Sequence, residues 1–275
     1  MTNNFNTIEG IIGAIQNPEY YVNRQSGIWQ ATKEYEKYTM RVIRDVNLVM
    51  DIPFSREELQ LVTNADQPWS DLHFNERVSG EPLNPGESYR IWPYNKFQDN
   101  DDPYMTGKQK FSHTYMERFW PCVAGDEFER REEGMGIRDN ENIGIRYEYG
   151  DLSDVMEQLA NNTLTRQAYL PIFFPEDTGA VHKQRVPCTL GYLFEIWEDR
   201  LDVTYYIRSC DTFRHLRNDI YLAGLLVQYI TDRINLNTNK YSPGKLTMKI
   251  ANLHLFENDL YAFQKKERKL NINGK

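Results

Sequence analysis

The hydrophobic pattern in the C-terminal half of the chain changes between the periods of strands and helices. Residues 189–197 and 201–207 are alternating, aromatic-rich segments with a short polar connection, which predicts a β-hairpin. Residues 219–233 repeat apolar positions at helical spacing and predict a core helix. Residues 246–256 alternate again, like a strand. Strands, a helix and a further strand around one sheet indicate an α+β domain.

The N-terminal half carries weaker signals. Residues 7–16 predict a short amphipathic helix, and the β-branched segment 38–50 predicts a strand. Residues 55–80 predict helical structure that ends at Gly80.

A polar, glycine-rich segment at 95–150 interrupts the pattern, and we expect loops and short helices there that form an insertion. Residues 151–162 predict a helix capped by Asp151 or Ser153. We expect residues 1–275 to form a single domain that contains this insertion.

Composition excludes several classes of protein. The chain has 275 residues and a net charge of -8, which argues against a general nucleic-acid binder. Its three cysteines, Cys122, Cys188 and Cys210, are too few for a disulfide framework and favour a reducing compartment. The sequence lacks an apolar run of membrane-spanning length and a signal-peptide pattern at its start, so we expect no membrane association and a cytoplasmic location.

The hairpin brings candidate chemistry together at one end of the sheet. Folding about Asp199 pairs residues whose numbers sum to about 398, which places Cys188 opposite Cys210 and close to Arg208 and Asp211. A positive charge lowers the pKa of a nearby thiol, and a guanidinium can bind a phosphate. The alternative is that both cysteines are small buried hydrophobic residues. The chain has no metal-ligand motif or phosphate-binding glycine loop, so we expect no metal.

Residues 186–230 resemble the core of thymidylate synthases and pyrimidine nucleotide hydroxymethylases. An Arg-Ser-Cys-Asp motif begins twenty residues after Cys188, and Asp219 lies eleven residues after Arg208, as in that family. The resemblance is strongest over 166–256. It implies a thymidylate synthase-like fold with a mixed or antiparallel sheet flanked by helices, and a homodimer.

The resemblance also implies a role for individual residues. Cys188 corresponds to the thiolate that adds to pyrimidine C6, and Arg208 to the arginine that lowers its pKa and binds the 5′-phosphate. Ser209 is expected to bind the same phosphate. His254 and Phe256 occupy the positions of the sugar-binding His and Tyr, although Phe256 has no hydroxyl group to donate.

Four further positions follow from the resemblance. Asp211 and Trp92 are expected to contact the folate co-substrate, 5,10-methylenetetrahydrofolate; the alternative for Trp92 is a core residue. Arg166 matches the arginine that reaches the phosphate site of the partner subunit. Arg24 sits where the family has an arginine in a glycine-containing loop; the alternative for Arg24 is a solvated surface residue.

The residue that reads the base departs from the synthases, which use Asn to recognise uracil. A protonated carboxyl group offers one donor and one acceptor, so Asp219 can complement cytosine if burial raises its pKa. The alternative is a one-residue shift that makes Asn218 the reader. Thr189 after the nucleophile and the polar chain end 265–275 also resemble deoxycytidylate hydroxymethylases more than synthases.

The acidic residue that transfers protons through water in this family has two candidates here, Glu76 and Asp71. Either could instead be a surface acid on a helix. His113 and Glu117 could cover the site or belong to an insertion that packs on itself, which is the interpretation we favour.

These features predict 5-hydroxymethylation of a cytidine monophosphate, dCMP in preference to CMP. A thymidylate synthase or dUMP hydroxymethylase that reads the base with Asn218 is the first alternative. A catalytically silent nucleotide-binding protein with the same fold is the second, and Phe256 favours it.

Overall fold

The computed structural model describes residues 3–25, 39–94, 111, 113–121, 150–175, 177, 186–237 and 240–273. The strands in these ranges are β1 Asn3–Phe5, β2 Val22–Gln25, β3 Thr39–Asp51, β4 Tyr169–Pro171, β5 Thr189–Trp197, β6 Arg200–Ile207, β7 Cys210–Asp211 and β8 Ser242–Phe256. They form one sheet in the order β1-β3-β8-β6-β5-β4, with β2 paired to β3 and β7 paired to β8. Parallel and antiparallel pairs both occur, which confirms the predicted mixed sheet.

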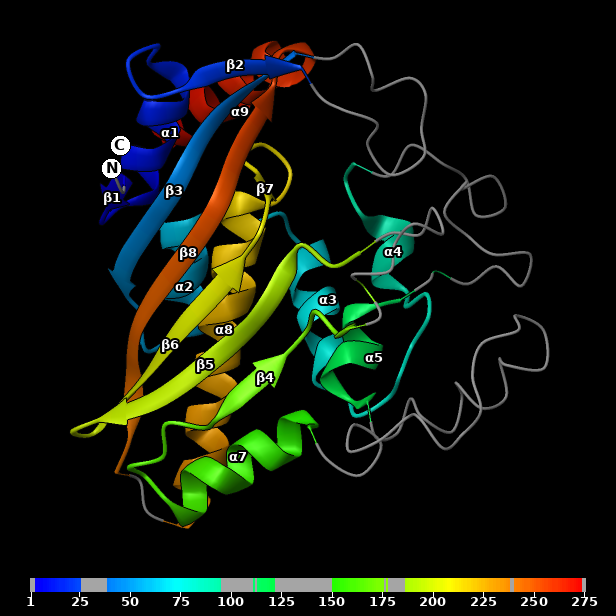
Figure 1. Cartoon of the computed structure of the whole chain (residues 1–275), viewed down its shortest axis with the longest axis vertical. Coiled ribbons are helices and arrows are strands. Elements are labelled where there is room, and N and C mark those ends of the chain that lie inside the picture. Colours follow the sequence, from blue (N-terminus) through cyan, green and yellow to red (C-terminus); the bar gives the residue numbers. More distant parts are fainter. Residues whose placement is uncertain are drawn as a thin grey trace.

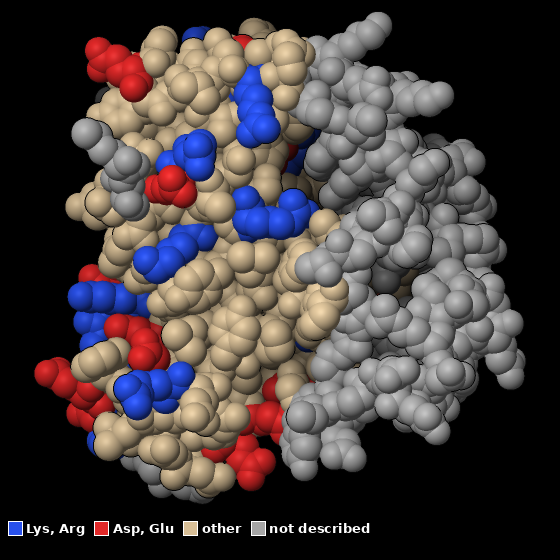
Figure 2. All heavy atoms as spheres, viewed as in Figure 1, with Lys and Arg blue, Asp and Glu red and all other residues tan. Residues whose placement is uncertain are grey.

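The described helices are α1 Ile8–Gln16, α2 Arg56–Thr63, α3 Trp69–Arg77, α4 Ser88–Ile91, α5 Tyr115–Phe119, α7 Leu152–Asn161, α8 Leu216–Ile234 and α9 Leu260–Asn273, with 3-10 turns at Asn235–Asn237 and Glu257–Asp259. In Figure 1, α2 and α8 lie behind the sheet. None of the described helices is long and apolar enough to cross a membrane. Figure 2 shows Lys and Arg side chains dispersed among uncharged residues over the opposite face, so the part of that face the structure describes carries no continuous basic surface.

The connection through α8 determines where the site forms. Strands β6 and β8 are neighbours and parallel, so the chain must cross over between them, and α8 makes this crossover. Because β5 runs antiparallel to β6, the start of β5, the end of β6 and the first turn of α8 meet at one end of the sheet. Cys188, Arg208 and Asp219 stand at these three places.

Alternating burial explains how the sheet packs. Along β6, Leu201, Val203, Tyr205 and Ile207 are buried, and the residues between them are half-buried. The buried face packs against α8, whose apolar residues extend around most of the helix. The predicted hairpin strands and the predicted helix at 219–233 are therefore confirmed.

The segment predicted to be helical over 55–80 forms two helices rather than one. Helix α2 ends at Asn64, which adopts a left-handed conformation with φ 49°, and α3 begins after Pro68. Asn tolerates this conformation better than most residues, and it stops the helix after two turns. Gly80 has φ +84° in the turn after α3, in line with the predicted end. The helix predicted at 151–162 is α7, capped by Asp151. Most of 95–150 lies outside the described residues.

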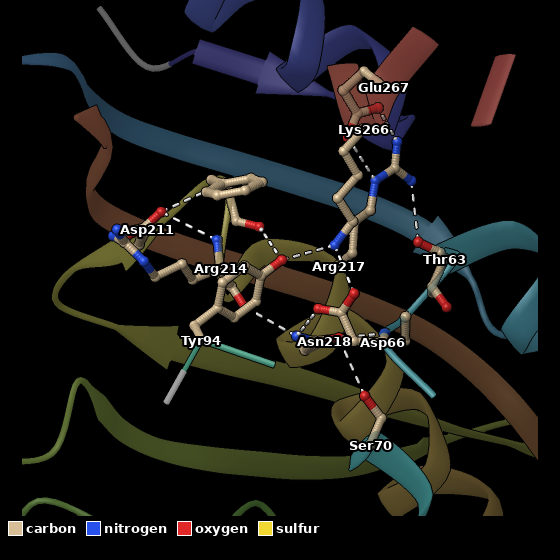
Figure 3. Close-up of polar contacts among 12 residues, drawn as sticks. Thr63, Asp66, Ser70, Tyr94, Asp211, Arg214, Arg217, Asn218, Lys266 and Glu267 are labelled. Carbon is tan, nitrogen blue, oxygen red and sulfur yellow. Dashed lines mark hydrogen bonds and ion pairs between the residues drawn. The ribbon is translucent and has the colours of Figure 1, made fainter. Parts of the chain in front are cut away.

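Helix α9 is held to the core by ion pairs (Figure 3). Arg217 forms a buried pair with Glu267, with 2.7 Å between Nη2 and Oε2, and donates to the carbonyl of Thr63. Lys266 pairs with Asp66 over 2.7 Å. Helix α9 thus docks through polar side chains, Glu267 against the start of α8 and Lys266 against the segment between α2 and α3.

Candidate active site

Cys188 and Arg208 lie side by side at the end of the hairpin. The backbone N–H of Arg208 donates to the carbonyl of Cys188 over 2.9 Å. The Arg208 guanidinium donates to the carbonyls of Pro187 and Val186 over 2.9 and 3.0 Å. Arg208 therefore holds the backbone that leads into the half-buried Cys188.

The predicted pairing of Cys188 with Cys210 is wrong. Trp197 pairs with Arg200 around a two-residue turn, and an irregularity in β5 shifts the register by one more residue, so that Thr189 faces Ile207. Cys188 consequently faces Arg208. Cys210 belongs to β7, where it pairs with Leu253 of β8. Cys122 lies outside the described residues.

Asp219 lies in the first turn of α8 against β7. The thiol of Cys210 donates to its Oδ2 over 3.8 Å. Burial raises the pKa of Asp219 to about 7, against the opposing effect of the positive charge on Arg77. Asp219 must keep its proton to complement cytosine. With this pKa, the protonated form is present near neutral pH.

Asn218 is occupied by structural hydrogen bonds on another face of α8 (Figure 3). Its Nδ2 donates to Asp66 and to the carbonyl of Arg214, over 3.0 and 2.9 Å. Its Oδ1 accepts from the N–H of Asp66 and the hydroxyl of Ser70, over 2.8 and 3.1 Å. The amide of Asn218 thus donates two hydrogen bonds and accepts two, which is its full capacity. It has no donor or acceptor left for a base.

The predicted phosphate and sugar residues meet where β7 runs beside β8. The hydroxyl of Ser209 and Nδ1 of His254 are 3.3 Å apart. Burial lowers the pKa of His254, so this imidazole is neutral at neutral pH. The ring of Phe256 packs against His254 with 5.3 Å between centroids, but Phe256 is only 3% exposed and pairs with Met40.

Asp211 and Trp92, the predicted folate contacts, lie in one neighbourhood. The N–H of His215 donates to the carbonyl of Asp211, and the His215 ring stacks on Trp92 with 5.5 Å between centroids. Burial raises the pKa of Asp211, but the positive charge that His254 carries in acid and the positive charge of Arg214 outweigh it, and the carboxyl pKa lies below its usual value. The indole Nε1 of Trp92 is buried and has no hydrogen-bond partner among the described residues. This N–H and the adjacent aromatic rings suit a heteroaromatic ligand such as a pterin.

The two candidate acids have different surroundings. Glu76 is buried and accepts hydrogen bonds from both the N–H and the hydroxyl of Ser88. Asp71 is more exposed and pairs with Arg56 and with the hydroxyl of Tyr221. Tyr221 lies two residues after Asp219, on a different side of α8, so the structure does not bring Asp71 to the site.

The remaining predicted residues lie at the periphery. Arg24 is an exposed residue of β2, in a strand rather than a loop, and the glycine that follows it is outside the described residues. Arg166 is exposed in the turn between α7 and β4. Glu117 closes the capping box of α5 and accepts a hydrogen bond from Asn84, which lies outside 95–150. Arg118 of the same helix pairs with Asp177. The interpretation of an insertion that packs on itself is therefore wrong for α5. His113 is half-buried before that helix.

Sequence reasoning did not identify Arg77 and Tyr115. The hydroxyl of Tyr115 is 3.2 Å from Oγ1 of Thr189, which is also 2.8 Å from the hydroxyl of Tyr205. The guanidinium of Arg77 lies over the Tyr115 ring, 4.1 Å from its centroid. The hydroxyl of Thr189 is thus fixed beside the nucleophile. Neither α3 nor α5 carries a motif that would have indicated this contact.

The described residues contain no group of three or more His, Cys, Asp or Glu side chains arranged to hold a metal ion. The chemistry available at this end of the sheet is a thiol, a guanidinium, a neutral imidazole and a carboxyl group that titrates near neutral pH. This set suits the addition of a thiolate to an electrophilic carbon.

The family model for thymidylate synthase matches residues 87–271, about two thirds of the chain. The chain belongs to the thymidylate synthase family. A similar protein is "Putative thymidylate synthase" of Methanococcoides burtonii, 24% identical over 170 residues, which are 61% of this chain and 64% of that protein. The alignment therefore spans less than two thirds of the relative.

Thymidylate synthases are one-carbon transferases that act at pyrimidine C5. Thymidylate synthases use methylenetetrahydrofolate as co-substrate, bind a pyrimidine nucleoside monophosphate and are typically dimers. The matched residues include Trp92, Cys188, Arg208 and Asp219, whereas Glu76 lies before the match.

Proposed function

We propose that this protein converts a cytidine monophosphate, dCMP in preference to CMP, into its 5-hydroxymethyl derivative. The observation that carries the proposal is the pair of adjacent side chains at the start of α8. Asp219 is a buried carboxyl group with a pKa of about 7, and the neighbouring Asn218 amide is fully hydrogen-bonded elsewhere. A neutral carboxyl group donates to cytosine N3 and accepts from the N4 amino group.

The first step uses Cys188 and Asp219 together. The Cys188 thiolate forms a bond to C6, the C5=C6 double bond shifts to C5=C4, and the electrons of C4=N3 move onto N3. The proton of Asp219 passes to N3, so that the adduct is neutral and Asp219 becomes a carboxylate. C5 is now an enamine carbon and attacks the one-carbon unit.

Water completes the reaction. After the new C5 bond forms, loss of the C5 proton and of tetrahydrofolate leaves an exocyclic methylene group on the nucleotide. Water adds to this carbon, and Cys188 departs as C5=C6 is restored. The folate leaves without oxidation, so the reaction needs no further reductant. Residues 265–275 are polar and basic, which favours a site that admits this water, whereas a synthase must exclude it.

The nucleotide contacts are assigned by chemistry and position. Arg208 and Ser209 bind the 5′-phosphate, for which a guanidinium fork and a hydroxyl are suited. His254 binds the sugar. Phe256 is buried and has no hydroxyl, so it donates no hydrogen bond to the sugar. The preference for deoxyribose rests on Ser209 and the Arg-Ser-Cys-Asp motif, which resemble those of the deoxynucleotide enzymes. Asp211 and Trp92 bind the pterin, and Glu76 is the candidate for proton transfer through water.

The test is a product analysis. The purified protein is incubated with methylenetetrahydrofolate and dCMP, CMP or dUMP, and the nucleotides are analysed by mass spectrometry. The expected product carries a hydroxymethyl group on cytosine, and no dihydrofolate absorbance develops. Failure to modify either cytidylate would overturn the proposal.

Thymidylate synthesis is the second candidate, because the similar archaeal protein carries that name. It predicts turnover of dUMP with the appearance of dihydrofolate in the same assay. The full use of the Asn218 amide in structural hydrogen bonds weighs against this candidate.

We also propose a homodimer in which Arg166 binds the phosphate in the partner's site. The exposed position of Arg166 is compatible with this role. C188A and R166A should each be inactive alone, whereas mixed subunits should regain activity, because one site in the heterodimer has both native residues. A monomeric active enzyme, or mixed dimers without recovery, would contradict the proposal.

A further inference from the structure

A chain of hydrogen bonds on α3 and α4 leads from Glu76 to Arg77. Ser88 donates to Glu76 from its N–H over 3.0 Å and from its hydroxyl. Nδ1 of His73 is 3.0 Å from Oγ of Ser88, and Nη2 of Arg77 is 2.9 Å from Nε2 of His73. A side chain at Gly86 would overlap the Glu76 carboxylate, so the turn before α4 must be free of a Cβ here.

The direction of these bonds follows from the number of hydrogens. Ser88 has one hydroxyl hydrogen and gives it to Glu76, so Nδ1 of His73 must donate to Ser88. Nε2 then has no hydrogen and accepts from the guanidinium of Arg77. Burial, with the positive charges of Arg77 and His215, lowers the pKa of His73 well below its usual value, which agrees with a neutral imidazole. His73 therefore orients Arg77 without neutralising it.

Arg77 is a buried cation at the edge of the proposed base site. Its side chain is 5% exposed, lies over the Tyr115 ring, and has an Nε–H without a hydrogen-bond partner among the described residues. No carboxylate in the described part of the chain forms an ion pair with it. A buried guanidinium in this state is costly, and it suits a site where negative charge develops during a reaction.

Arg77 reaches the site through Tyr115: its guanidinium lies 4.1 Å from the centroid of the ring whose hydroxyl is 3.2 Å from Oγ1 of Thr189. From this position its charge acts on Asp219. The groups that interact electrostatically with Asp219 are Arg77 of α3, Tyr115 of α5, Tyr192 of β5, Tyr205 of β6, and Cys210 and Asp211 of β7. Two of them, Tyr115 and Cys210, also interact with Cys188. The tyrosines and the thiol are neutral near pH 7, because burial raises the pKa of each. Asp211 is negative, so Arg77 is the cation in this group.

We propose that Arg77 is a positioning residue of the reaction: held by His73, its charge stabilises the carboxylate that Asp219 becomes when the proton moves to pyrimidine N3. This inference rests on the proposed function. Substrate binding needs Asp219 protonated, and the step that follows needs it ionised. A cation beside Asp219 therefore weakens cytosine binding at high pH and speeds the proton transfer.

Removal of the charge should move these two properties in opposite directions. In R77M, the pH midpoint above which dCMP binding is lost should rise by about one unit, a size typical of a nearby buried charge. The turnover number should fall by about tenfold, since one pKa unit corresponds to a tenfold change in the proton-transfer equilibrium. A purely structural defect would weaken binding and turnover together.

The experiment measures Kd for dCMP by calorimetry, without folate, from pH 6 to 9, and the turnover number with folate. R77Q provides the same test if R77M does not fold, and R77K should restore the wild-type midpoint. In a double-mutant cycle, H73F and R77M should not be additive, because His73 acts through Arg77. R56M is the matched control: it removes a cation that pairs with Asp71 away from the site and should leave the midpoint in place.

The outcomes separate the two proposals. A wild-type protein that does not bind or modify a cytidylate ends the proposed function. A wild-type protein that does both, with R77M and R77Q midpoints equal to its own, overturns the role of Arg77 alone.

Discussion

The thiol of Cys210 donates a hydrogen bond to the carboxyl group of Asp219, with 3.8 Å between Sγ and Oδ2. A thiol is a weak donor, so this contact offsets little of the cost of ionising a buried carboxyl group. Burial consequently raises the pKa of Asp219 to about 7. Position 219 thus has a group whose protonation changes within the usual range of an enzyme assay.

The affinity for dCMP should fall as pH rises. Asp219 complements cytosine in its protonated form, and its pKa is raised to about 7, so the competent form is present below this value and is lost above it. Above the midpoint, Kd should increase about tenfold per pH unit. Calorimetric titrations from pH 5.5 to 9 would show this slope, and binding that strengthens with pH would contradict it.

Asp219→Asn should move the preference from cytidylate toward uridylate. The amide has no acidic proton to pass to cytosine N3 during thiolate addition, whereas uracil can place the charge on O4. Turnover of dCMP should fall by about 10²-fold or more, the range expected when a general acid is removed. Competition between dCMP and dUMP in one reaction measures the change. An Asn variant that still prefers cytosine would show that another residue reads the base.

Cys188→Ala should abolish turnover and keep nucleotide binding. The variant lacks the nucleophile that activates C5, while Arg208 still holds the carbonyls of Val186 and Pro187. Exchange of the C5 hydrogen of dCMP with solvent, followed by NMR, should also stop. Residual exchange above background would assign the nucleophile to another group.

Glu267→Ala should destabilise the protein by about 3 kcal/mol, because it leaves the buried Arg217 guanidinium with only the exposed carboxylate of Glu9, 3.8 Å away. Denaturant unfolding measures the change. The double variant R217M/E267L removes both charges and should recover much of the loss. An equal loss in the single and double variants would mean that packing, not charge, holds α9.

The sequence predicts the long strands and the crossover helix, but not the short strands β1, β2, β4 and β7, helix α9 or all of the pairing. Alternation and helical spacing identify β5, β6, α8 and β8, since these segments bury one face or most of a helix. The register of the hairpin does not follow from this pattern, because one residue fewer in the turn and one irregularity in β5 displace Cys188 from Cys210 to Arg208.

The sequence predicts those residues of the candidate site that a motif or a spacing identifies. Cys188, Arg208 and Asp219 do gather at one end of the sheet, as the hairpin and helix require. Arg77 was missed because its contacts with His73 and Tyr115 depend on how α3 and α5 pack, and a charged residue near the end of a helix looks like an ordinary surface residue in sequence. Only the burial of Arg77 in the structure distinguishes it from such a surface residue.

The hydrogen bonds of Asn218 have a consequence for how the choice of base could change. Successive side chains of a helix point about 100° apart. The rotation of α8 about its own axis, its phase, therefore decides whether residue 218 or residue 219 faces the nucleotide. Asp66 and Ser70 fix that phase by binding the Asn218 amide from the side away from the substrate. Loss of this anchor, or a residue gained or lost in the turn before α8, would let the helix rotate and exchange an acid for an amide without any change at either position.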